Sequence, residues 1–478
     1  MKRIYLDYAA TTPVDPIVKK AMEPYFSEKF GNPSSLHFFG QQAMTAVDES
    51  REKIAKIIGA NFREIIFTGS ATEANNLALR GAVKKFDNFR AVAFQKQNNF
   101  APAAKFSSPS ARQFALGETK LVAPAGRSSR QSALNQIFLP LRIIVSAIEH
   151  ESILETCRDL EKEGIEVIYL PVNREGLIDL KKLKEALNEW TVLVSIMYAN
   201  NEVGTIQPIS AITKIIKEFR IKNLEFRANN NPQSSILNPQ FYPLLHTDAV
   251  QAFQYLDCNV NKLGVDFMTL SGHKIYGPKG IGLLYRRIQN KELRIKDFNN
   301  DSLNPQSSIL NSIITGGGQE FGFRSGTENM AAIVGFAKAA EIISSSRELE
   351  NRRIGKLADY FWKQIKKIYP KAEINGIMNN KSGIMDKKIN FIIQKIPNIL
   401  NIYFPGKSAE ELLIKLDLAG MAVSSGSACS TRSSKPSHVL KSCGLPENRI
   451  KSSLRISLGK FTTKAEIDEA IKRIAPIV

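Results

Sequence analysis

The chain has 478 residues, of which 43% are hydrophobic and 23% are charged, and it carries a formal net charge of +19. This composition is that of a globular protein long enough for two or three domains, and the basic excess permits a nucleic-acid or acidic partner without requiring one. The sequence has no run of about 18 apolar residues and no signal-peptide core in its opening residues, MKRIYLDYAATTP. We therefore expect a cytosolic protein that does not span a membrane.

The first predicted elements are a helix over residues 41–58 and a short buried strand over residues 64–68. The strand runs into a small-residue turn, GSATE at residues 69–73, after which helical periodicity resumes. The first N–H groups of a helix have no internal partner, so this turn can bind an anion with help from the Thr72 hydroxyl. An ordinary helix N-cap explains the same residues.

The alternation of strands and helices continues further along the chain. Apolar strands are predicted at residues 141–148, 165–170 and 191–199, with helices over 151–162 and near 179–189. This pattern predicts an α/β fold with a mostly parallel sheet covered by helices, whose ligands lie beyond the carboxyl ends of the strands.

Polar residues cluster after four of the predicted strands. They are Glu149 and His150, then Asn200, Asn201 and Glu202, then residues 246–251, and finally Ser271, Gly272, His273 and Lys274. Any one of these groups is compatible with a capped loop. Four groups at one edge of a sheet indicate a site.

The segment MTLSGHKIYGPKGIG, residues 268–282, places Lys274 in a glycine-rich turn. A partly desolvated lysine amine attacks an aldehyde, and Ser271, His273 and the turn N–H groups can hold a phosphate beside it. Pyridoxal phosphate carries both groups. A solvated lysine in a surface turn is the alternative that the tetrapeptide alone leaves open.

Further residues suit the ring of such a cofactor. Asp248 precedes Lys274 by 26 residues and can keep a pyridine nitrogen protonated. Gln251 or Asn201 can donate to the ring oxygen, and the imidazole of His150 can lie on the ring.

The four cysteines show neither CxxC spacing nor the density of a disulfide scaffold, which fits a reducing compartment. Cys157 and Cys258 are expected to be buried small hydrophobes. Cys429 lies in SSGSACST, residues 424–431, where small neighbours leave it either exposed and reactive or incidental in a loop. Arg455 is a candidate clamp for a substrate carboxylate, or else part of a surface salt bridge.

Three stretches near residues 91–139, 225–245 and 296–312 interrupt the alternation with Ser, Asn, Gln and Pro. The octapeptide NPQSSILN occurs at residues 231–238 and again at 304–311, and we interpret these stretches as inserted surface loops. We expect a large domain over residues 15–330, and a small domain made of residues 1–14 and 331–478 that carries the cysteine segment.

Together these motifs are recognisable. YLDYAATTPVDP, GNPSSLH, FTGSATEANN, ANNEVGTIQPI, HTDAVQ, SGHKIYGPKGIG, GGGQE, RSGTEN, SSGSACS and SLRISLGKFTT resemble, in order, the landmarks of the NifS/IscS-type cysteine desulfurases in the class V aminotransferase group. One departure is Thr68-Gly69-Ser70, where the family usually has Thr-Ser-Gly.

The resemblance implies a fold-type I homodimer with pyridoxal phosphate attached to Lys274. The cofactor would be bound by residues from several loops, with Thr327 reaching in from the neighbouring subunit. These residues are Ala71, Thr72, His150, Asn201, Asp248, Gln251, Ser271, Gly272, His273, Lys274 and Thr327. Asn201 and Arg455 would grip the substrate carboxylate.

The implied reaction converts L-cysteine to L-alanine and leaves a persulfide on Cys429, with Lys274 and His150 as the other catalytic residues. The sulfur would pass to an acceptor protein, either an iron–sulfur scaffold or a tRNA-thiolation enzyme. No metal site and no direct nucleic-acid binding are expected. The alternatives are another pyridoxal-phosphate lyase or aminotransferase, in which Cys429 is incidental, and a non-catalytic basic binding protein.

Overall fold

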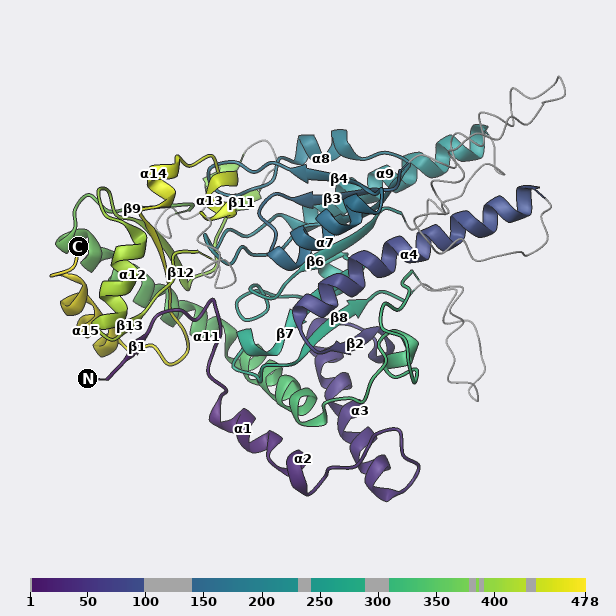
Figure 1. The fold of residues 1–478 in the computed structure, drawn as a ribbon, viewed down its shortest axis with the longest axis horizontal. Coiled ribbons are helices and arrows are strands. Elements are labelled where there is room, and N and C mark those ends of the chain that lie inside the picture. Colours follow the sequence, from purple (N-terminus) through teal and green to yellow (C-terminus); the bar gives the residue numbers. More distant parts are fainter. Residues whose placement is uncertain are drawn as a thin grey trace.

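A computed structural model describes residues 2–98, 140–230, 242–288, 309–377, 384–386, 391–426 and 436–478. Figure 1 shows a large sheet with its helices on one side of the molecule and a smaller sheet on the other, beside the N- and C-termini. One long helix, α11 (Met330–Ile368), reaches from the first part to the second.

The large sheet has seven strands in the order β2-β8-β7-β6-β5-β3-β4. The strands from β3 to β7 run parallel, and β8 is antiparallel to both of its neighbours. The strands are β2 (Ile65–Thr68), β3 (Arg142–Ser146), β4 (Glu166–Leu170), β5 (Thr191–Ser195), β6 (Leu244–Asp248), β7 (Phe267–Ser271) and β8 (Gly282–Arg286). The predicted α/β class with a mostly parallel sheet is confirmed.

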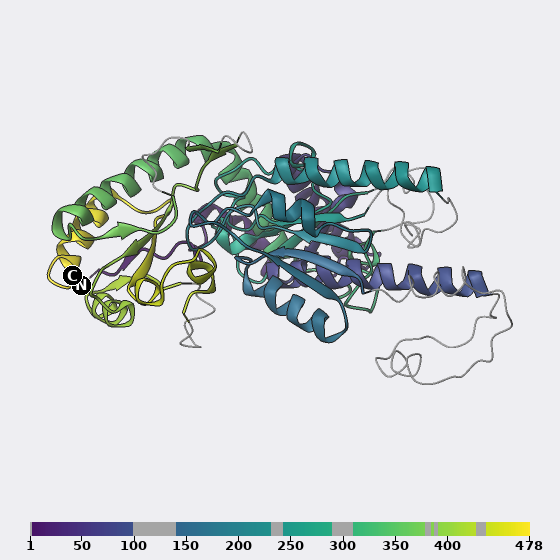
Figure 2. The ribbon, with the colours of Figure 1, turned by 90° about the horizontal axis from the view of Figure 1, so that it is seen from above.

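Helices cover both faces of this sheet (Figures 1 and 2). Successive strand residues pack into different cores: Ile143 belongs to the cluster with α4 and α7, whereas Ile144 belongs to the larger cluster with α3 and α9. Because both faces are buried, the strands are continuously apolar instead of alternating. The covering helices are α3 (Phe38–Ile58), α4 (Ala71–Asn98), α7 (Glu151–Lys162), α8 (Leu180–Ala186), α9 (Ile209–Asn230) and α10 (Val260–Leu263).

The smaller part contains a three-stranded antiparallel sheet, β14-β12-β9, and a parallel pair of β1 and β13. These strands are β1 (Ile4–Tyr5), β9 (Glu373–Ile374), β12 (Ile399–Tyr403), β13 (Met421–Ala422) and β14 (Ser453–Ser457). A separate antiparallel pair consists of β10 (Ile384–Asp386) and β11 (Phe391–Ile393). The remaining helices are α1 (Pro16–Met22), α2 (Pro24–Ser27), α12 (Ala409–Leu418), α13 (His438–Ser442), α14 (Glu447–Ile450) and α15 (Lys464–Ile474).

The described ends of the three predicted insertions differ from the prediction. Residues 91–98 continue α4 as a helix, and residues 225–230 continue α9. Ile309 and Leu310, from the second octapeptide, are buried in the apolar cluster that includes residues of α4. The end of the third insertion is therefore part of the core and not a surface loop. The first octapeptide and residues 99–139 lie outside the described residues.

Among the described residues, none of the helices has the length and apolar character needed to cross a membrane.

Candidate active site

Lys274 ends a short 3-10 turn, Gly272–Lys274, directly after β7. Its Nζ donates hydrogen bonds to the carbonyl oxygens of Ala9 at 2.6 Å and Ala10 at 2.7 Å. The turn is tight enough to require glycine at 272, since a Cβ there would lie 2.7 Å from Ile281 Cγ2 and 2.9 Å from the Pro278 oxygen. The sequence therefore fixes the lysine amine at the carboxyl end of a central strand.

The N-terminal strap, which we define as residues 7–12, lies against this turn. Thr12 Oγ1 donates to the His273 carbonyl at 3.0 Å and accepts the Tyr276 N–H at 2.8 Å. Thr11 Oγ1 lies 3.1 Å from His273 Nδ1. Gln251 Nε2 donates to the Ala9 carbonyl at 2.9 Å. The strap thus brings together the predicted residues Lys274, His273 and Gln251.

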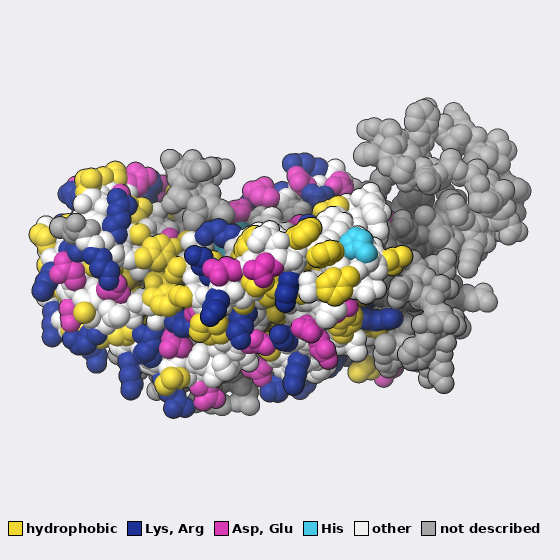
Figure 3. Space-filling model, turned by 90° about the horizontal axis from the view of Figure 1, so that it is seen from below, with side chains coloured by type: hydrophobic (Ala, Val, Ile, Leu, Met, Phe, Trp, Pro, Cys, Tyr) yellow, Lys and Arg dark blue, Asp and Glu magenta, His cyan; other side chains and the backbone are white. Residues whose placement is uncertain are grey.

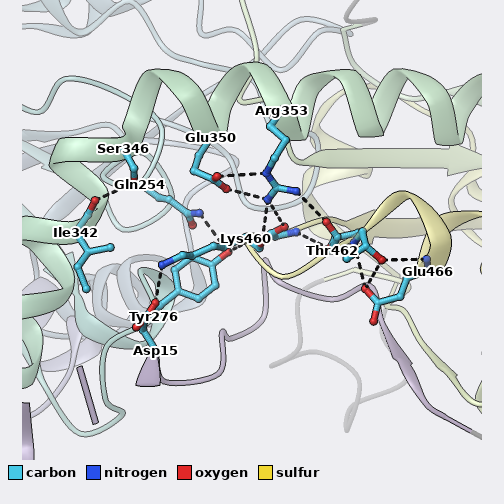
Figure 4. Close-up of polar contacts among 12 residues, drawn as sticks. Asp15, Gln254, Tyr276, Ile342, Ser346, Glu350, Arg353, Lys460, Thr462 and Glu466 are labelled. Atoms are coloured by element: carbon cyan, nitrogen blue, oxygen red, sulfur yellow. Dashed lines mark hydrogen bonds and ion pairs between the residues drawn. The ribbon is translucent and has the colours of Figure 1, made fainter. Parts of the chain in front are cut away.

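Beyond the strap, a network of polar contacts links Asp15, Tyr276, Lys460 and Arg353, as Figure 4 shows. Lys460 Nζ pairs with Asp15 Oδ2 at 2.5 Å, and the Lys460 N–H donates to the Tyr276 hydroxyl at 2.5 Å. Arg353 of α11 donates to the Lys460 carbonyl at 2.7 Å. Tyr276 has a φ of 66°, a left-handed conformation that side chains seldom adopt, and these contacts hold it.

Asp248 lies at the end of β6 and is only 6% exposed. Its Oδ2 accepts a hydrogen bond from Asn75 Nδ2 at 2.9 Å, and its Oδ1 accepts the Val250 N–H at 3.0 Å. Each carboxylate oxygen of Asp248 therefore has a hydrogen-bond donor, which fixes the orientation of the side chain. Asn75, on α4, was not among the predicted site residues, although it lies one helical turn after Thr72.

His150 caps the start of α7, and its Nδ1 accepts the Ser152 N–H at 3.1 Å. Burial lowers the pKa of His150, the charge of Lys274 lowers it further, and the charge of Asp248 opposes both. Burial likewise lowers the pKa of His273 to about 4, again with a contribution from Lys274. His150, Asp248 and Lys274 are therefore electrostatic neighbours, and both imidazoles are neutral near pH 7.

In the predicted anion turn, two side chains accept hydrogen bonds from the turn backbone. Ser70 Oγ accepts the Glu73 N–H at 3.1 Å, and Glu73 Oε2 accepts the Gly69 N–H at 2.9 Å. A Cβ at Gly282, where β8 begins, would lie 2.3 Å from the Ser70 carbonyl carbon, so only glycine lets this turn approach the β8 strand so closely. Thr72 is exposed at the start of α4.

Arg455 lies in the middle of β14 and is 1% exposed. Its Nη1 donates to the Asn201 carbonyl at 3.0 Å, and its Nη2 pairs with Asp7 Oδ1 at 2.7 Å. The alternative of a surface salt bridge is wrong, because the guanidinium is buried. The Arg455 backbone also exchanges hydrogen bonds with Ser424, which begins the cysteine segment.

Some predicted residues lie elsewhere. Cys429 falls outside the described residues, so its placement stays a prediction. Thr327 is exposed, and its role toward a neighbouring subunit stays a prediction. His246 and Thr247 lie inside β6 and are fully buried, so they are part of the sheet instead of its ligand edge. Ala71 begins α4, and Ser271 is the buried last residue of β7.

The other three cysteines are buried, unlike the exposed thiol predicted at Cys429. Cys157, Cys258 and Cys443 are all buried, which confirms the prediction for the first two. Burial raises the pKa of each of these thiols to about 12. Their thiolates are therefore not populated near neutral pH.

Within the described ranges, no three His, Cys, Asp or Glu side chains are grouped closely enough to hold a metal ion.

The fold is similar to those of several solved structures. A chain described as a NifS-like protein superposes with a TM-score of 0.72 at 30% sequence identity, covering 99% of each chain. A second structure, described as SspA in complex with cysteine, has a TM-score of 0.64 at 30% identity and is covered over its whole length by 96% of this chain.

Residues 4–112, 133–224 and 240–470 match the aminotransferase class-V family, and the chain belongs to that family. Among curated relatives, the cysteine desulfurase IscS of Dictyoglomus turgidum (strain DSM 6724 / Z-1310) is 38% identical over 479 aligned positions, which cover 100% of this chain and 95% of the relative. These matches confirm the predicted resemblance to NifS/IscS-type cysteine desulfurases and the predicted fold class.

Proposed function

We propose that this protein is a pyridoxal-phosphate-dependent cysteine desulfurase that converts L-cysteine to L-alanine and retains the sulfur as a persulfide on Cys429. The observation that carries the proposal is the meeting of Lys274, His150 and Asp248 at the carboxyl edge of the sheet. Relatives named as cysteine desulfurases, which this chain matches over 95% and 90% of their length, support the choice of reaction.

The donor set fits the cofactor group by group. Lys274 offers an amine for the aldehyde, and the buried, doubly hydrogen-bonded carboxylate of Asp248 suits a protonated pyridine nitrogen. His150 would lie against the ring, and Gln251 and Asn201 would serve its oxygen. The phosphate would be held by Ala71, Thr72, Ser271, Gly272 and His273, with Thr327 of a second subunit. When bound, pyridoxal phosphate supplies a sink for the electrons released at the substrate Cα.

The side chains of Lys274 and Cys429 would carry out the remaining steps of the reaction. Lys274 moves the proton of the substrate Cα, for which its amine must be neutral at that moment. The thiolate of Cys429 attacks the substrate sulfur, so that an S–S bond forms and the bond between sulfur and Cβ breaks. The electron pair of that bond stays with carbon, which takes up a proton and becomes the methyl group of L-alanine.

The choice of Cys429 also rests on the other cysteines. A sulfur carrier must be a thiolate near neutral pH and must reach both cofactor and acceptor. Cys157, Cys258 and Cys443 meet neither requirement, because they are buried and their thiol pKa values are about 12.

We further propose a homodimer that hands sulfur to an acceptor protein, either an iron–sulfur scaffold or a tRNA-thiolation enzyme. Exposed apolar side chains on and around α1 to α3 support a contact between two copies. They are Ile17, Phe26, Phe30, Leu36, Phe38 and Phe39. Figure 3 views this side of the molecule and shows hydrophobic side chains gathered among charged ones.

Two measurements test the function. The purified protein should show the visible absorbance of a lysine-bound pyridoxal group, and Lys274→Ala should abolish it. The native chain should release L-alanine from L-cysteine, Cys429→Ser should stop that release, and Cys443→Ser should leave it nearly unchanged. A Cys429→Ser variant with full turnover would favour another lyase or aminotransferase of the same fold.

A further inference from the structure

The ion pair between Arg455 and Asp7 carries an inference beyond the proposed roles. Arg455 Nη2 lies 2.7 Å from Asp7 Oδ1, and the two side chains are 1% and 16% exposed. A buried guanidinium without an anion is costly, so a resident carboxylate stabilises it in the absence of substrate. Arg455 is also the residue that would receive the substrate carboxylate under the proposed function.

The position of Asp7 does not depend on this ion pair. Ser457, two residues beyond Arg455 on β14, donates its N–H to the Leu6 carbonyl at 2.8 Å and accepts the Tyr8 N–H at 3.3 Å. The Ser457 hydroxyl accepts the Ala9 N–H at 2.9 Å. These bonds fasten the backbone on both sides of Asp7 to the strand that carries Arg455. The carboxylate can therefore release the guanidinium without a shift of the strap.

Few other groups compete for the guanidinium. Arg455 Nη1 donates to the neutral Asn201 carbonyl at 3.0 Å, and the buried Arg455 Nε has no hydrogen-bond partner among the residues that the structure describes. Tyr5 also lies near Asp7 and Arg455, but its hydroxyl donates to the backbone carbonyls of Asp7 and Thr11. Burial raises the pKa of Tyr5 to about 12, so the side chain is uncharged near pH 7. Asp7 is thus the carboxylate in contact with Arg455 among the described residues.

We propose that Asp7 is a stand-in for the substrate carboxylate: it neutralises Arg455 in the empty site and competes with the incoming carboxylate for the same guanidinium. Two carboxylates at one cation repel each other, so the charge of Asp7 weakens substrate binding and raises KM. Asp7 is therefore a specificity-determining residue, which tunes affinity for carboxylate ligands without touching the reacting atoms. This inference rests on the proposed role of Arg455.

The test compares ligands that differ in one charge. Binding of L-alanine and of L-alanine methyl ester to the holoenzyme is measured by titration of the visible absorbance and by the shift in melting temperature. Asp7→Asn should bind L-alanine roughly tenfold more tightly than the native chain and bind the ester with unchanged affinity, because the ester has no carboxylate. KM for L-cysteine should fall by a similar factor.

Two control variants and one further measurement separate an effect of the Asp7 charge from a general change in structure. Asp7→Glu keeps the charge and should retain the native affinity. Asp15→Asn removes a different ion pair near the strap, the one with Lys460, and should change the affinity for neither ligand. The melting temperature of Asp7→Asn should be lower without ligand and recover more on addition of L-alanine.

Equal or weaker L-alanine binding by Asp7→Asn, or an equal change for the ester, would overturn the inference. A protein that binds L-alanine in this charge-dependent way without consuming L-cysteine would refute the proposed reaction and leave the role of Asp7 standing.

Discussion

His246 shows at the residue scale how a polar side chain becomes part of the sheet. Its Nδ1 lies 2.8 Å from Ser195 Oγ on β5, and its Nε2 lies 3.0 Å from Thr269 Oγ1 on β7. The imidazole thus bridges the two neighbouring strands of β6. Burial lowers the pKa of His246 to about 3, so the ring is neutral in the folded state.

This burial predicts a pH dependence of stability. The unfolded chain binds a proton at His246 below about pH 6.5, whereas the folded chain does not until about pH 3. The free energy of unfolding therefore decreases as the pH is lowered from about 6.5 to about 3. We expect a loss of roughly 1 kcal/mol per pH unit from this group.

Urea unfolding at several pH values checks the expectation. His246→Asn should be less stable at neutral pH and should lose less stability on acidification. An equal slope in both chains would contradict it.

The sequence predicts Lys274, Asp248 and His150 correctly as residues of one sheet edge, because the ends of parallel strands converge whatever the connecting segments do. It does not predict that Asn75 bonds to Asp248 or that Asp7 pairs with Arg455. Asp7 reaches Arg455 across 448 positions of the chain, and no local pattern encodes a pair at that separation. Such contacts follow only from the packing of the strap against β14.

At the element scale, the short helix α13 ties the C-terminal part of the chain to the site. Ser437 caps the helix, and its hydroxyl donates to Glu202 Oε2 at 2.5 Å. His438 Nε2 donates to the Glu149 carbonyl at 3.0 Å, and His438 Nδ1 lies 3.3 Å from Glu151 Oε1. Two residues that flank His150 are therefore held by α13.

We expect His438→Ala to loosen this attachment. The Glu149 carbonyl would lose its donor, which costs about 1 kcal/mol of stability, and the orientation of His150 would become less defined. The predicted result is a lower kcat with a smaller change in KM, together with an altered visible spectrum. His37→Ala, at the cap of the distant α3, is the matched control and should leave the spectrum intact. Identical kinetics of His438→Ala and the native chain would exclude a positioning role.

Element boundaries were predictable where local signals agree. The predicted helix over residues 151–162 matches α7, because an N-cap and an amphipathic pattern coincide there. Three consecutive serines, Ser344 to Ser346, interrupt the apolar pattern in the middle of α11, yet the helix is continuous from Met330 to Ile368. Ser345 and Ser346 bond back to the Ile342 carbonyl, so these serines satisfy their hydroxyls within the helix instead of ending it.

At the scale of the whole molecule, the exposed apolar side chains predict self-association. Leu36 is 91% exposed and Phe38 69% exposed, and both belong to the group around α1 to α3. The double substitution Leu36→Asp and Phe38→Asp should shift the chain from dimer to monomer in sedimentation equilibrium, because two buried charges at an interface are costly.

The matched control changes two exposed residues on other surfaces, Leu349 and Ile414, to aspartate. That variant should remain dimeric. A native chain that sediments as a monomer at micromolar concentration would contradict the proposed dimer.

The central claim is that sulfur from L-cysteine moves to one particular thiol of this chain. Mass spectrometry of the protein after a brief exposure to L-cysteine tests it most directly, since peptides containing Cys429 and Cys443 can be resolved. We predict one added sulfur atom on the Cys429 peptide, with L-alanine formed in equal amount and Cys443 unmodified. L-Alanine formed without sulfur on Cys429, or sulfur on Cys443 instead, would contradict the account.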